Sequence, residues 1–270
     1  MKIVFATHNQ GKLAEMKRLL SGLDIELLGA EEAGVMEDVV EDGKTFKENV
    51  LKKAMFVAKR TGEWTIADDS GLCIDAFDGQ PGVHTARWAG EKVSKEKLAD
   101  YTIEKMKDIP ASNRMAFWKC VIVLIGPDGR NWMFDGRVDG IIALQKKGLP
   151  KPALPYDPIF IPNGEARTFS EMSDEEKNSM SHRGRAVAKL KVFLNNNKRI
   201  MSIKNGVYKH FKGGRYRVLG VAKHSETLKD LVIYQKIDDK KDLWARPLEM
   251  FLGEVEVDGN KTSRFKYIGG

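Results

Sequence analysis

Residues 2–20 read KIVFATHNQGKLAEMKRLL, an apolar stretch followed by a polar turn and a helical pattern. We predict a strand over Lys2–Ala6 and a helix over Leu13–Leu20. The turn between them consists of Thr7, His8, Asn9, Gln10, Gly11 and Lys12. Backbone N–H groups at a helix N-terminus carry positive potential, and the glycine and the lysine favour close approach of an anion. The turn therefore suits phosphate oxygens, although it lacks P-loop spacing and an ordinary capping turn would have a similar composition.

The alternation of strands and helices continues to about residue 196. Strands are predicted at 25–28, 64–67, 116–125 and 131–138, and helices at 45–60 and 94–106. Ser173 and Glu176 fit a capping box that opens a helix running to about Leu194, with a break near His182. Strands that alternate with helices favour an α/β fold around a mixed sheet.

The strand predicted at 64–67 ends in an acidic loop that contains Asp68, Asp69 and Ser70. Two adjacent carboxylates at the end of a buried strand repel each other and lose hydration unless a cation or hydrogen-bond donors compensate. A hard divalent ion such as Mg²⁺ would compensate them through oxygen ligands, and Glu41 could supply a further carboxylate. The alternatives are a solvated acidic turn and, for Glu41, an exposed position.

Two later segments combine polar groups that could contact a ligand. Tyr156 and Asp157 follow a stretch with three prolines and three lysines, which is also typical of a surface linker. The second segment is a run of donors in a predicted helix, at Lys177, Ser181, His182 and Arg183. The lysine and the serine lie four residues apart and would share a helix face. A solvated basic helix face would show the same pattern.

The composition indicates a folded chain. Of 270 residues, 42% are hydrophobic and 31% are charged. The short apolar stretch at the start ends at once in polar residues, so a secretory signal is disfavoured, and no apolar run approaches the roughly 20 residues of a membrane span. Only Cys73 and Cys120 are present, too few for a disulfide framework and without CxxC spacing. We therefore expect a cytoplasmic protein with reduced thiols and no membrane association.

The excess positive charge is confined to the last quarter of the chain. Residues 1–197 hold 29 Lys and Arg and 29 Asp and Glu, whereas residues 198–270 hold 16 and 9, and 16 − 9 accounts for the whole net charge of +7. A polar break at about 196–204 follows the last predicted helix of the first part. We predict two domains, one over 1–196 and one over 204–270.

The second domain consists of short β-rich segments separated by turn formers. Within one predicted strand, Tyr216, Val218, Gly220 and Ala222 would share a face. A small twisted barrel or half-barrel fits this pattern best.

Six blocks of the first domain, in this order, closely resemble the inosine triphosphate pyrophosphatase family of house-cleaning nucleotide hydrolases. They are THNQGK at 7–12, EDGKTFKEN at 41–49, ADDSGL at 67–72, PGVHTARWAG at 81–90, YDPIF at 156–160 and EEKNSMSHRG at 175–184. The resemblance implies an elongated, two-lobed mixed α/β fold with a central cleft, and a homodimer. It also implies Mg²⁺ dependence and hydrolysis of purine nucleoside triphosphates with altered bases to the monophosphate and pyrophosphate.

The resemblance further implies roles for residues at the phosphate end of the cleft. The turn at 7–12 would cradle the triphosphate, and Lys12 would neutralise its charge during catalysis. Asp69 resembles the residue assigned as metal ligand and water-activating base, with Asp68 beside it at the metal and Ser70 touching substrate. Glu41 resembles an additional metal carboxylate.

At the other end, the resemblance implies a nucleobase pocket formed by Tyr156, Asp157, Lys177, His182 and Arg183. Family members usually carry Gly-Phe-Gly ahead of the Tyr-Asp-Pro block, and the phenylalanine stacks on the base. This chain has Ala153, Leu154 and Pro155 there. Leu154 offers apolar contact without a π-face, so we expect a shifted or broadened base preference.

Residues 206–268 resemble a small bacterial domain family of unknown function, which implies no chemistry. Its basic charge with Tyr208, Phe211, Tyr216 and Trp244 could form a nucleic-acid or nucleotide surface. Alternatively, the aromatic residues form the core and the lysines keep the domain soluble.

The favoured interpretation is a cytosolic, Mg²⁺-dependent pyrophosphatase that acts on ITP, dITP, XTP or related purine nucleotides. One alternative is a nucleotide or nucleic-acid binding protein without turnover. Another is a pyrophosphatase that prefers a different modified base.

Overall fold

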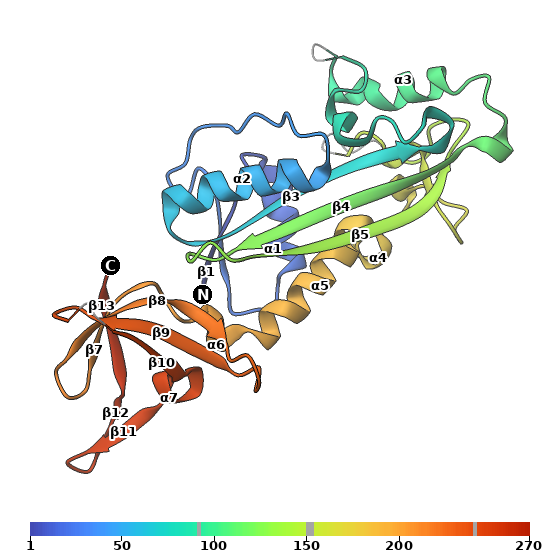
Figure 1. Ribbon diagram of the computed structural model, residues 1–270. Coiled ribbons are helices and arrows are strands. Elements are labelled where there is room, and N and C mark those ends of the chain that lie inside the picture. Colours follow the sequence, from blue (N-terminus) through green and yellow to red (C-terminus); the bar gives the residue numbers. More distant parts are fainter. Residues whose placement is uncertain (91–92, 150–153, 240–241) are drawn as a thin grey trace. The chain divides into compact units, whose positions relative to one another are not determined.

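The first unit is built on a six-stranded sheet in the order β2-β1-β3-β4-β5-β6. Strands β1, β3, β4 and β5 of this sheet are labelled in Figure 1. The computed structural model describes residues 1–90, 93–149, 154–239 and 242–270. The six strands are β1 (Lys2–Phe5), β2 (Glu26–Gly29), β3 (Trp64–Ile74), β4 (Met115–Ile125), β5 (Asn131–Ile142) and β6 (Phe160–Pro162). β1 pairs in parallel with β2 and β3, and all pairs from β3 to β6 are antiparallel. The predicted mixed sheet is therefore confirmed.

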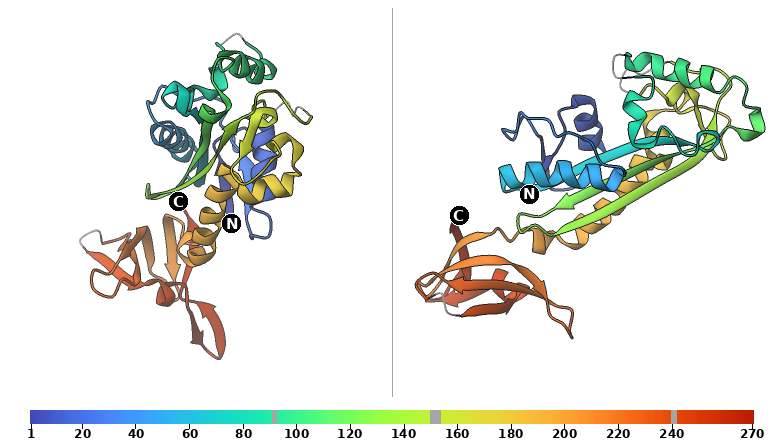
Figure 2. Two further views of the ribbon diagram at one scale, coloured as in Figure 1. Left: turned by 90° about the vertical axis from the view of Figure 1, so that its right-hand side faces the viewer. Right: turned by 45° about the horizontal axis from the view of Figure 1, so that its top comes forward.

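Helices lie against this sheet. They are α1 (Gln10–Leu19), α2 (Phe46–Thr61), α3 (Leu98–Lys105), α4 (Asp174–Met180) and α5 (His182–Asn196). Helix α2 lies alongside β3 in Figure 1, and its apolar stripe packs on β3 and β4 through Phe46, Val50 and Ala54. The start of α5 lies directly on β5, because a Cβ on Gly136 would be 2.0 Å from the carbonyl oxygen of His182. Figure 2 shows β3, β4 and β5 running side by side along this unit.

Local sequence signals fix the ends of several helices. The side chain of Asn9 caps α1, and the predicted capping box of Ser173 and Glu176 is confirmed at α4. The predicted break near His182 is also confirmed, because Ser181 is extended between α4 and α5. The chain turns tightly there, since a Cβ on Gly184 would lie 1.8 Å from the Asn178 carbonyl oxygen. The helix predicted over 94–106 is shorter, a 3₁₀ turn at Lys95–Lys97 followed by α3.

The prediction of an acidic loop after residue 67 is wrong. β3 continues through Asp68, Asp69 and Ser70 to Ile74, and it pairs with β4 along that length. The strand ladder satisfies the backbone hydrogen bonds there, so adjacent carboxylates do not require a loop. Gly71 is needed within the strand, because a Cβ would lie 2.2 Å from the Gly82 carbonyl oxygen.

The C-terminal part is mostly β, as predicted. Its elements are α6 (Lys198–Met201), β7 (Gly206–His210), β8 (Arg215–Lys223), β9 (Asp230–Lys236), β10 (Leu243–Pro247), α7 (Leu248–Leu252), β11 (Glu254–Val257), β12 (Asn260–Ser263) and β13 (Phe265–Gly269). Five strands form an antiparallel sheet in the order β10-β9-β8-β7-β13, and β11 and β12 form a separate hairpin. Arg246 of β10 nevertheless lies over the ring of Phe265 of β13, 5.8 Å from its centroid. The two edge strands thus curl toward each other as in a half-barrel.

One face assignment in this part is wrong. Tyr216 and Val218 face the core, but the register shifts between Val218 and Gly220, and Val221 is buried in place of Ala222. A β-bulge inserts one residue and reverses the alternation beyond it.

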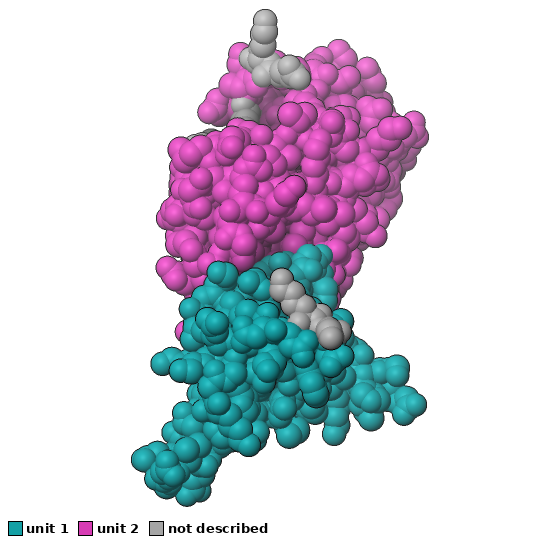
Figure 3. All heavy atoms as spheres, turned by 60° about the vertical axis from the view of Figure 1, so that its left-hand side comes forward, with its two compact units in different colours: residues 1, 126–130, 194–270 teal, residues 2–125, 131–193 magenta. Residues whose placement is uncertain are grey.

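Contacts within the chain divide it into two compact units, coloured separately in Figure 3. One comprises residues 2–125 and 131–193, and the other comprises residue 1 with 126–130 and 194–270. Across the described ranges, none of the helices combines the length and apolar character needed to cross a membrane. Cys73 and Cys120 are buried free thiols.

Candidate active site

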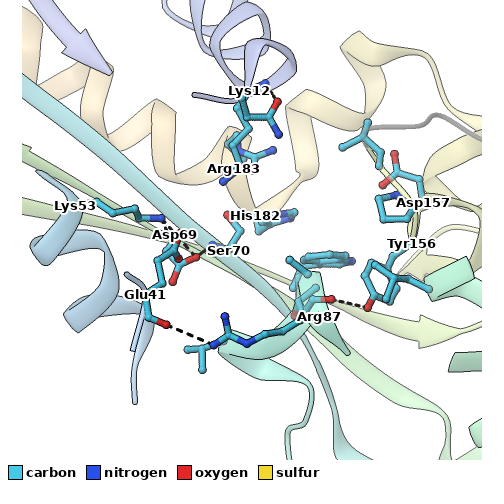
Figure 4. A pocket seen from close by; sticks show the side chains of 18 of the residues that line it. Lys12, Glu41, Lys53, Asp69, Ser70, Arg87, Tyr156, Asp157, His182 and Arg183 are labelled. Atoms are coloured by element: carbon cyan, nitrogen blue, oxygen red, sulfur yellow. Dashed lines mark hydrogen bonds and ion pairs between the residues drawn. The ribbon is translucent and has the colours of Figure 1, made fainter. Parts of the chain in front are cut away.

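A cleft of about 540 Å³ opens in the first unit. Its walls come from β3, β4, the starts of α1, α3 and α5, Lys53 of α2, Lys177 of α4, and the segments at 38–41, 83–87 and 154–157. Figure 4 shows Lys53 and Asp69 on one side, Tyr156 and Asp157 on the other, and His182 between them. The cleft therefore has a charged end and an aromatic end.

Asp68 forms ion pairs with two cationic side chains beneath the charged end of the cleft. Neighbouring residues in a strand point to opposite faces, so Asp68 faces α1 and α5 whereas Asp69 faces α2. Oδ1 of Asp68 accepts from Lys12 Nζ at 3.0 Å, and Oδ2 accepts from Arg183 Nη2 at 3.1 Å. Arg183 also donates to Glu15 at 2.8 Å. Burial disfavours the charge of Asp68, but Lys12 and Arg183 outweigh it and hold its pKa below the usual range.

Asp69 lies in a different environment on the other face of β3. Lys53 Nζ is 4.0 Å from Asp69 Oδ1 and 3.3 Å from Glu41 Oε2, and it donates to the Asp68 carbonyl oxygen at 3.0 Å. Burial raises the pKa of Asp69 to about 6, and the charges of Glu41 and Asp68 act in the same direction against Lys53 and Lys12. A carboxyl group with this pKa can accept and release protons near neutral pH.

Asp69 and Glu41 are the carboxylates that could hold a divalent cation. No three His, Cys, Asp or Glu side chains gather into a metal site within the described ranges. Mg²⁺, however, usually takes only one or two carboxylates and completes its shell with water and substrate phosphates. Oδ2 of Asp69 is buried without a hydrogen-bond partner among the described residues, so this pair of residues fits Mg²⁺. Asp68 is engaged through both oxygens, and its role as a metal ligand stays a prediction.

The aromatic end is centred on Trp118 of β4. The ring of His182 stacks on Trp118 with centroids 4.9 Å apart and planes at 13°. Tyr156 meets the same indole edge-on at 5.7 Å and donates its hydroxyl to the Thr85 carbonyl oxygen at 2.8 Å. These contacts fix the ring plane of His182 within the cleft.

His182 is held neutral in this position. Burial, followed by the charges of Arg183 and Lys177, keeps the pKa of His182 well below its usual value. Its Nδ1 is buried and has no hydrogen-bond partner among the described residues. Nearby, Lys177 Nζ contacts Asp157 Oδ2 at 2.5 Å, and both side chains are buried. The aromatic end therefore offers a neutral imidazole and a fixed ion pair to a ligand.

Most of the predicted site residues line this one cleft. They are Asn9, Lys12, Glu41, Asp69, Ser70, Leu154, Tyr156, Asp157, Lys177, His182 and Arg183. Ala153 lies outside the described residues.

Five predicted residues do not line the cleft. Gln10 and Gly11 are exposed at the start of α1, and Thr7 Oγ1 accepts from the backbone N–H of Asn9 at 3.1 Å. His8 contacts the Val35 carbonyl oxygen and Asp38, which together raise its pKa. Asp68 lies beneath the cleft floor and acts through Lys12 and Arg183.

The cleft residues that sequence reasoning missed include Lys53, Arg87 and Trp118. Lys53 follows Val50 by three residues and Phe46 by seven, so a lysine on the apolar stripe of a helix was an available signal. Arg87 belongs to the block at 81–90, and its Nη2 donates to the Glu41 carbonyl oxygen at 3.4 Å. Trp118 carries no local signal, because only the pairing of β4 brings it beside residues 156 and 182.

Comparison with known proteins assigns both parts of the chain to family models. Residues 3–193 match the model of the Ham1 family. Residues 206–267 match a model described only as a protein of unknown function, DUF1653.

Individual relatives agree with the first match. The dITP/XTP pyrophosphatase of Geobacter sulfurreducens is 42% identical over 193 residues, which cover 72% of this chain and 96% of the relative. The dITP/XTP pyrophosphatase of Porphyromonas gingivalis is 41% identical and covers 72% of this chain and 97% of its own length. A solved HAM1 protein from Coxiella burnetii superposes with a TM-score of 0.67 at 37% identity, covering 73% of this chain and 99% of that chain.

Proposed function

Because the chain belongs to the Ham1 family, we propose that it hydrolyses purine nucleoside triphosphates with altered bases, of the ITP, dITP and XTP type, to the monophosphate and pyrophosphate. The curated relatives named dITP/XTP pyrophosphatases support this substrate class. The observation that carries the proposal is the single cleft in which Asp69 faces Lys53 while Lys12 and Arg183 stand beside it.

At the phosphate end, Lys12 and Lys53 would bind the triphosphate. The resemblance implied the nucleobase pocket for Arg183, but its pairing with Asp68 and Glu15 beside Lys12 favours a role at the phosphate end as well. Negative charge grows on the leaving pyrophosphate and on the oxygens of the α-phosphorus, and fixed cations stabilise that charge without reorganising. Asp68 keeps Lys12 and Arg183 in place before substrate arrives. These cations would therefore act from preset positions.

Mg²⁺, held by Asp69 and Glu41 together with substrate phosphates, would supply charge neutralisation and a lower pKa for the attacking water. Asp69 would orient that water toward the α-phosphorus and accept its proton. Burial raises the pKa of Asp69 to about 6 in the protein without metal, and a bound cation would favour its ionised form, which is the form that accepts a proton.

At the base end, His182 would read the 6-keto oxygen of inosine or xanthine as a hydrogen-bond donor. Adenine carries an amino group there and would leave the buried donor unpaired. An unpaired buried donor costs about 1–3 kcal/mol, which is roughly 5- to 150-fold in selectivity. Trp118 fixes the plane of His182, so it contributes to this selectivity through position alone.

The test is a panel of ITP, dITP, XTP, ATP and GTP with Mg²⁺ or with EDTA, scored for monophosphate and pyrophosphate. We expect turnover of the altered purines with Mg²⁺ and none with EDTA. Asp69→Asn should lower kcat by about 10²- to 10⁴-fold. It should leave the fold intact, because an amide carries no charge to bury. Asp42→Asn, which removes an exposed carboxylate paired with Lys52, is the matched control.

Equal turnover by wild type and Asp69→Asn would overturn the assignment of the base. Binding of dITP without product would instead favour a nucleotide-binding protein. On the family resemblance we also propose a cytoplasmic homodimer, which light scattering of the purified chain and fractionation of cells would test.

A further inference from the structure

The C-terminal unit has a cavity of its own, of about 310 Å³. Its aromatic walls are Tyr216 of β8, Tyr234 of β9 and Trp244 of β10. Trp244 lies directly opposite Tyr234 in the β9–β10 pairing, and Val218 lies opposite Tyr234 on the other side. These side chains therefore share the concave face of the half-barrel. Trp244 nevertheless remains 51% exposed, so its ring is available at the mouth of the cavity.

Two cations stand beside these rings. Lys236 lies opposite Tyr216 in the sheet, and Arg246 lies two residues after Trp244 on the same face. Nε of Arg246 donates to the Tyr234 hydroxyl at 3.1 Å, which fixes the guanidinium beside the cavity. Burial, followed by the charges of Arg246, Arg264 and Lys212, lowers the pKa of His210 in the neighbouring strand β7. The cavity lining itself contains two cations, Lys236 and Arg246, and two carboxylates, Asp239 and Asp242.

The cations lack carboxylate partners although acidic residues line the same cavity. Neither Lys236 nor Arg246 forms an ion pair with a carboxylate in the parts of the chain that the structure describes. Asp239 and Asp242 are exposed residues of the cavity lining. An aromatic face between unpaired cations suits a base with its phosphate, and a rim carboxylate can accept from amino groups on a base edge.

We propose that this cavity binds one nucleotide of a single-stranded nucleic acid, with the base stacked on Trp244 and the flanking phosphates on Lys236 and Arg246. The cavity volume matches one such unit, because small-molecule pockets begin at about 300 Å³. Aromatic residues with acidic neighbours could also cage an alkylammonium ion, but two unpaired cations in the same wall oppose a cationic ligand. The excess of 16 Lys and Arg over 9 Asp and Glu in residues 198–270 favours a polyanion.

The test uses the full chain and fluorescence anisotropy with a labelled 12-nucleotide single strand that carries no 5′-phosphate, in EDTA. We expect Trp244→Ala to weaken binding about tenfold and Trp244→Phe to restore most of it, because stacking needs only a π-face. Lys236→Gln should reduce the dependence of log K on log salt by about one counterion. Lys209→Gln, which removes the same charge from the outer face of the sheet, should leave binding within about twofold.

Competing ligands identify what is recognised. An abasic strand of equal charge should compete at least tenfold more weakly than the intact strand. Equal competition would overturn the proposal, as would unchanged binding by a folded Trp244→Ala variant or displacement by a trimethylammonium peptide. Competition by a free nucleoside monophosphate at the same nucleotide concentration would support the same base-and-phosphate chemistry with a free nucleotide as its source. The assay measures binding and needs no turnover, so its result does not depend on whether the chain hydrolyses nucleotides as proposed above.

Discussion

The two cavities of this chain hold their cations in opposite ways. In the first unit, Lys12 and Arg183 share the carboxylate of Asp68, and Lys177 pairs with Asp157. In the C-terminal unit, Lys236 and Arg246 line a cavity without an ion pair to any described carboxylate. The cations of the cleft are therefore paired with buried carboxylates, whereas Lys236 and Arg246 of the smaller cavity form no ion pair with the described carboxylates at its rim.

This difference agrees with the two proposals, catalysis in the cleft of the first unit and ligand binding in the cavity of the C-terminal unit. Cations held by buried acids keep their positions as charge moves in the substrate, which is what stabilisation of a transition state requires. Unpaired cations near the surface gain their partners only from a ligand, so their binding falls as salt rises. Removing one carboxylate should consequently lower the free energy of unfolding far more when it belongs to the cleft than when it belongs to the cavity.

Asp68→Asn tests the balanced cleft most directly. Both oxygens of Asp68 are ion-paired in a buried position, and breaking a buried pair costs about 3–5 kcal/mol. We expect a loss of that size in the free energy of unfolding. Urea titration followed by tryptophan fluorescence measures it, because four of the five tryptophans lie in residues 1–197.

The matched change in the other cavity is Asp242→Asn. Asp242 is exposed at the rim, so the free energy of unfolding should change by less than about 0.5 kcal/mol. Similar losses in the two variants would contradict the contrast between balanced and unpaired charge. The pH dependence of wild type provides a further check. Because the pKa of Asp68 is held below its usual value, the contribution of Asp68 to the free energy of unfolding should be lost as the pH falls below about 4.

Features that depend on neighbouring residues could be predicted from the sequence. The turn after β1, the capping box at Ser173 and the break before His182 each follow from a few consecutive side chains. The resemblance of six blocks then linked distant segments, and eleven of the predicted residues line one cleft. Local side-chain chemistry and the order of the motifs along the chain were therefore sufficient to predict these features.

Features that depend on strand pairing could not be predicted. Asp68 and Asp69 are adjacent in sequence, yet the ladder with β4 turns them to opposite faces and gives them opposite pKa shifts. The bulge after Val218 reverses which residues of β8 face the core. Trp118 reaches the base end of the cleft only through its place in β4. Each of these positions follows from the register with a partner strand, which local sequence patterns do not specify.

His182 gives the next effect in size. The pKa of His182 in the fold is well below its value of about 6.5 in the unfolded chain, so the unfolded state binds more protons between the two. The contribution of His182 to the free energy of unfolding should therefore fall as the pH drops below about 6.5, by up to about 1.4 kcal/mol per pH unit. Asp69, whose pKa is raised to about 6, contributes with the opposite sign below that pH. The difference between wild type and His182→Gln in urea titrations at pH 5.5–7.5 isolates the contribution of His182.

His210 of the C-terminal unit is the matched comparison for that slope. Its pKa is also lowered, but it is less buried than His182, so His210→Gln should change the slope less. An equal slope in wild type and His182→Gln would show that the buried imidazole is not neutral in the fold.

Trp118 tests whether His182 acts through its fixed ring plane. Trp118→Leu removes the stacked partner, and aromatic pairs contribute about 0.5–1.5 kcal/mol. We expect the ratio of kcat/KM for dITP over dATP to fall by roughly 2- to 12-fold. Trp118→Phe should keep most of the ratio because a ring remains. An unchanged ratio in Trp118→Leu would mean that other contacts orient His182.

Leu154→Phe should give the smallest effect. It would make the lining of the cleft more similar to that of the cavity in the C-terminal unit, because it adds an aromatic ring. Trp244 offers an exposed π-face there, whereas Trp118 of the cleft is covered by His182 and the lining position 154 is aliphatic. A phenylalanine at 154 should stack on the base and raise kcat/KM for dITP about threefold, near the lower end of aromatic pair energies. Leu154→Met, of similar volume but without a ring, is the control. If both variants match wild type across the nucleotide panel, then the leucine does not set base preference, and the donors at 177 and 182 carry it instead.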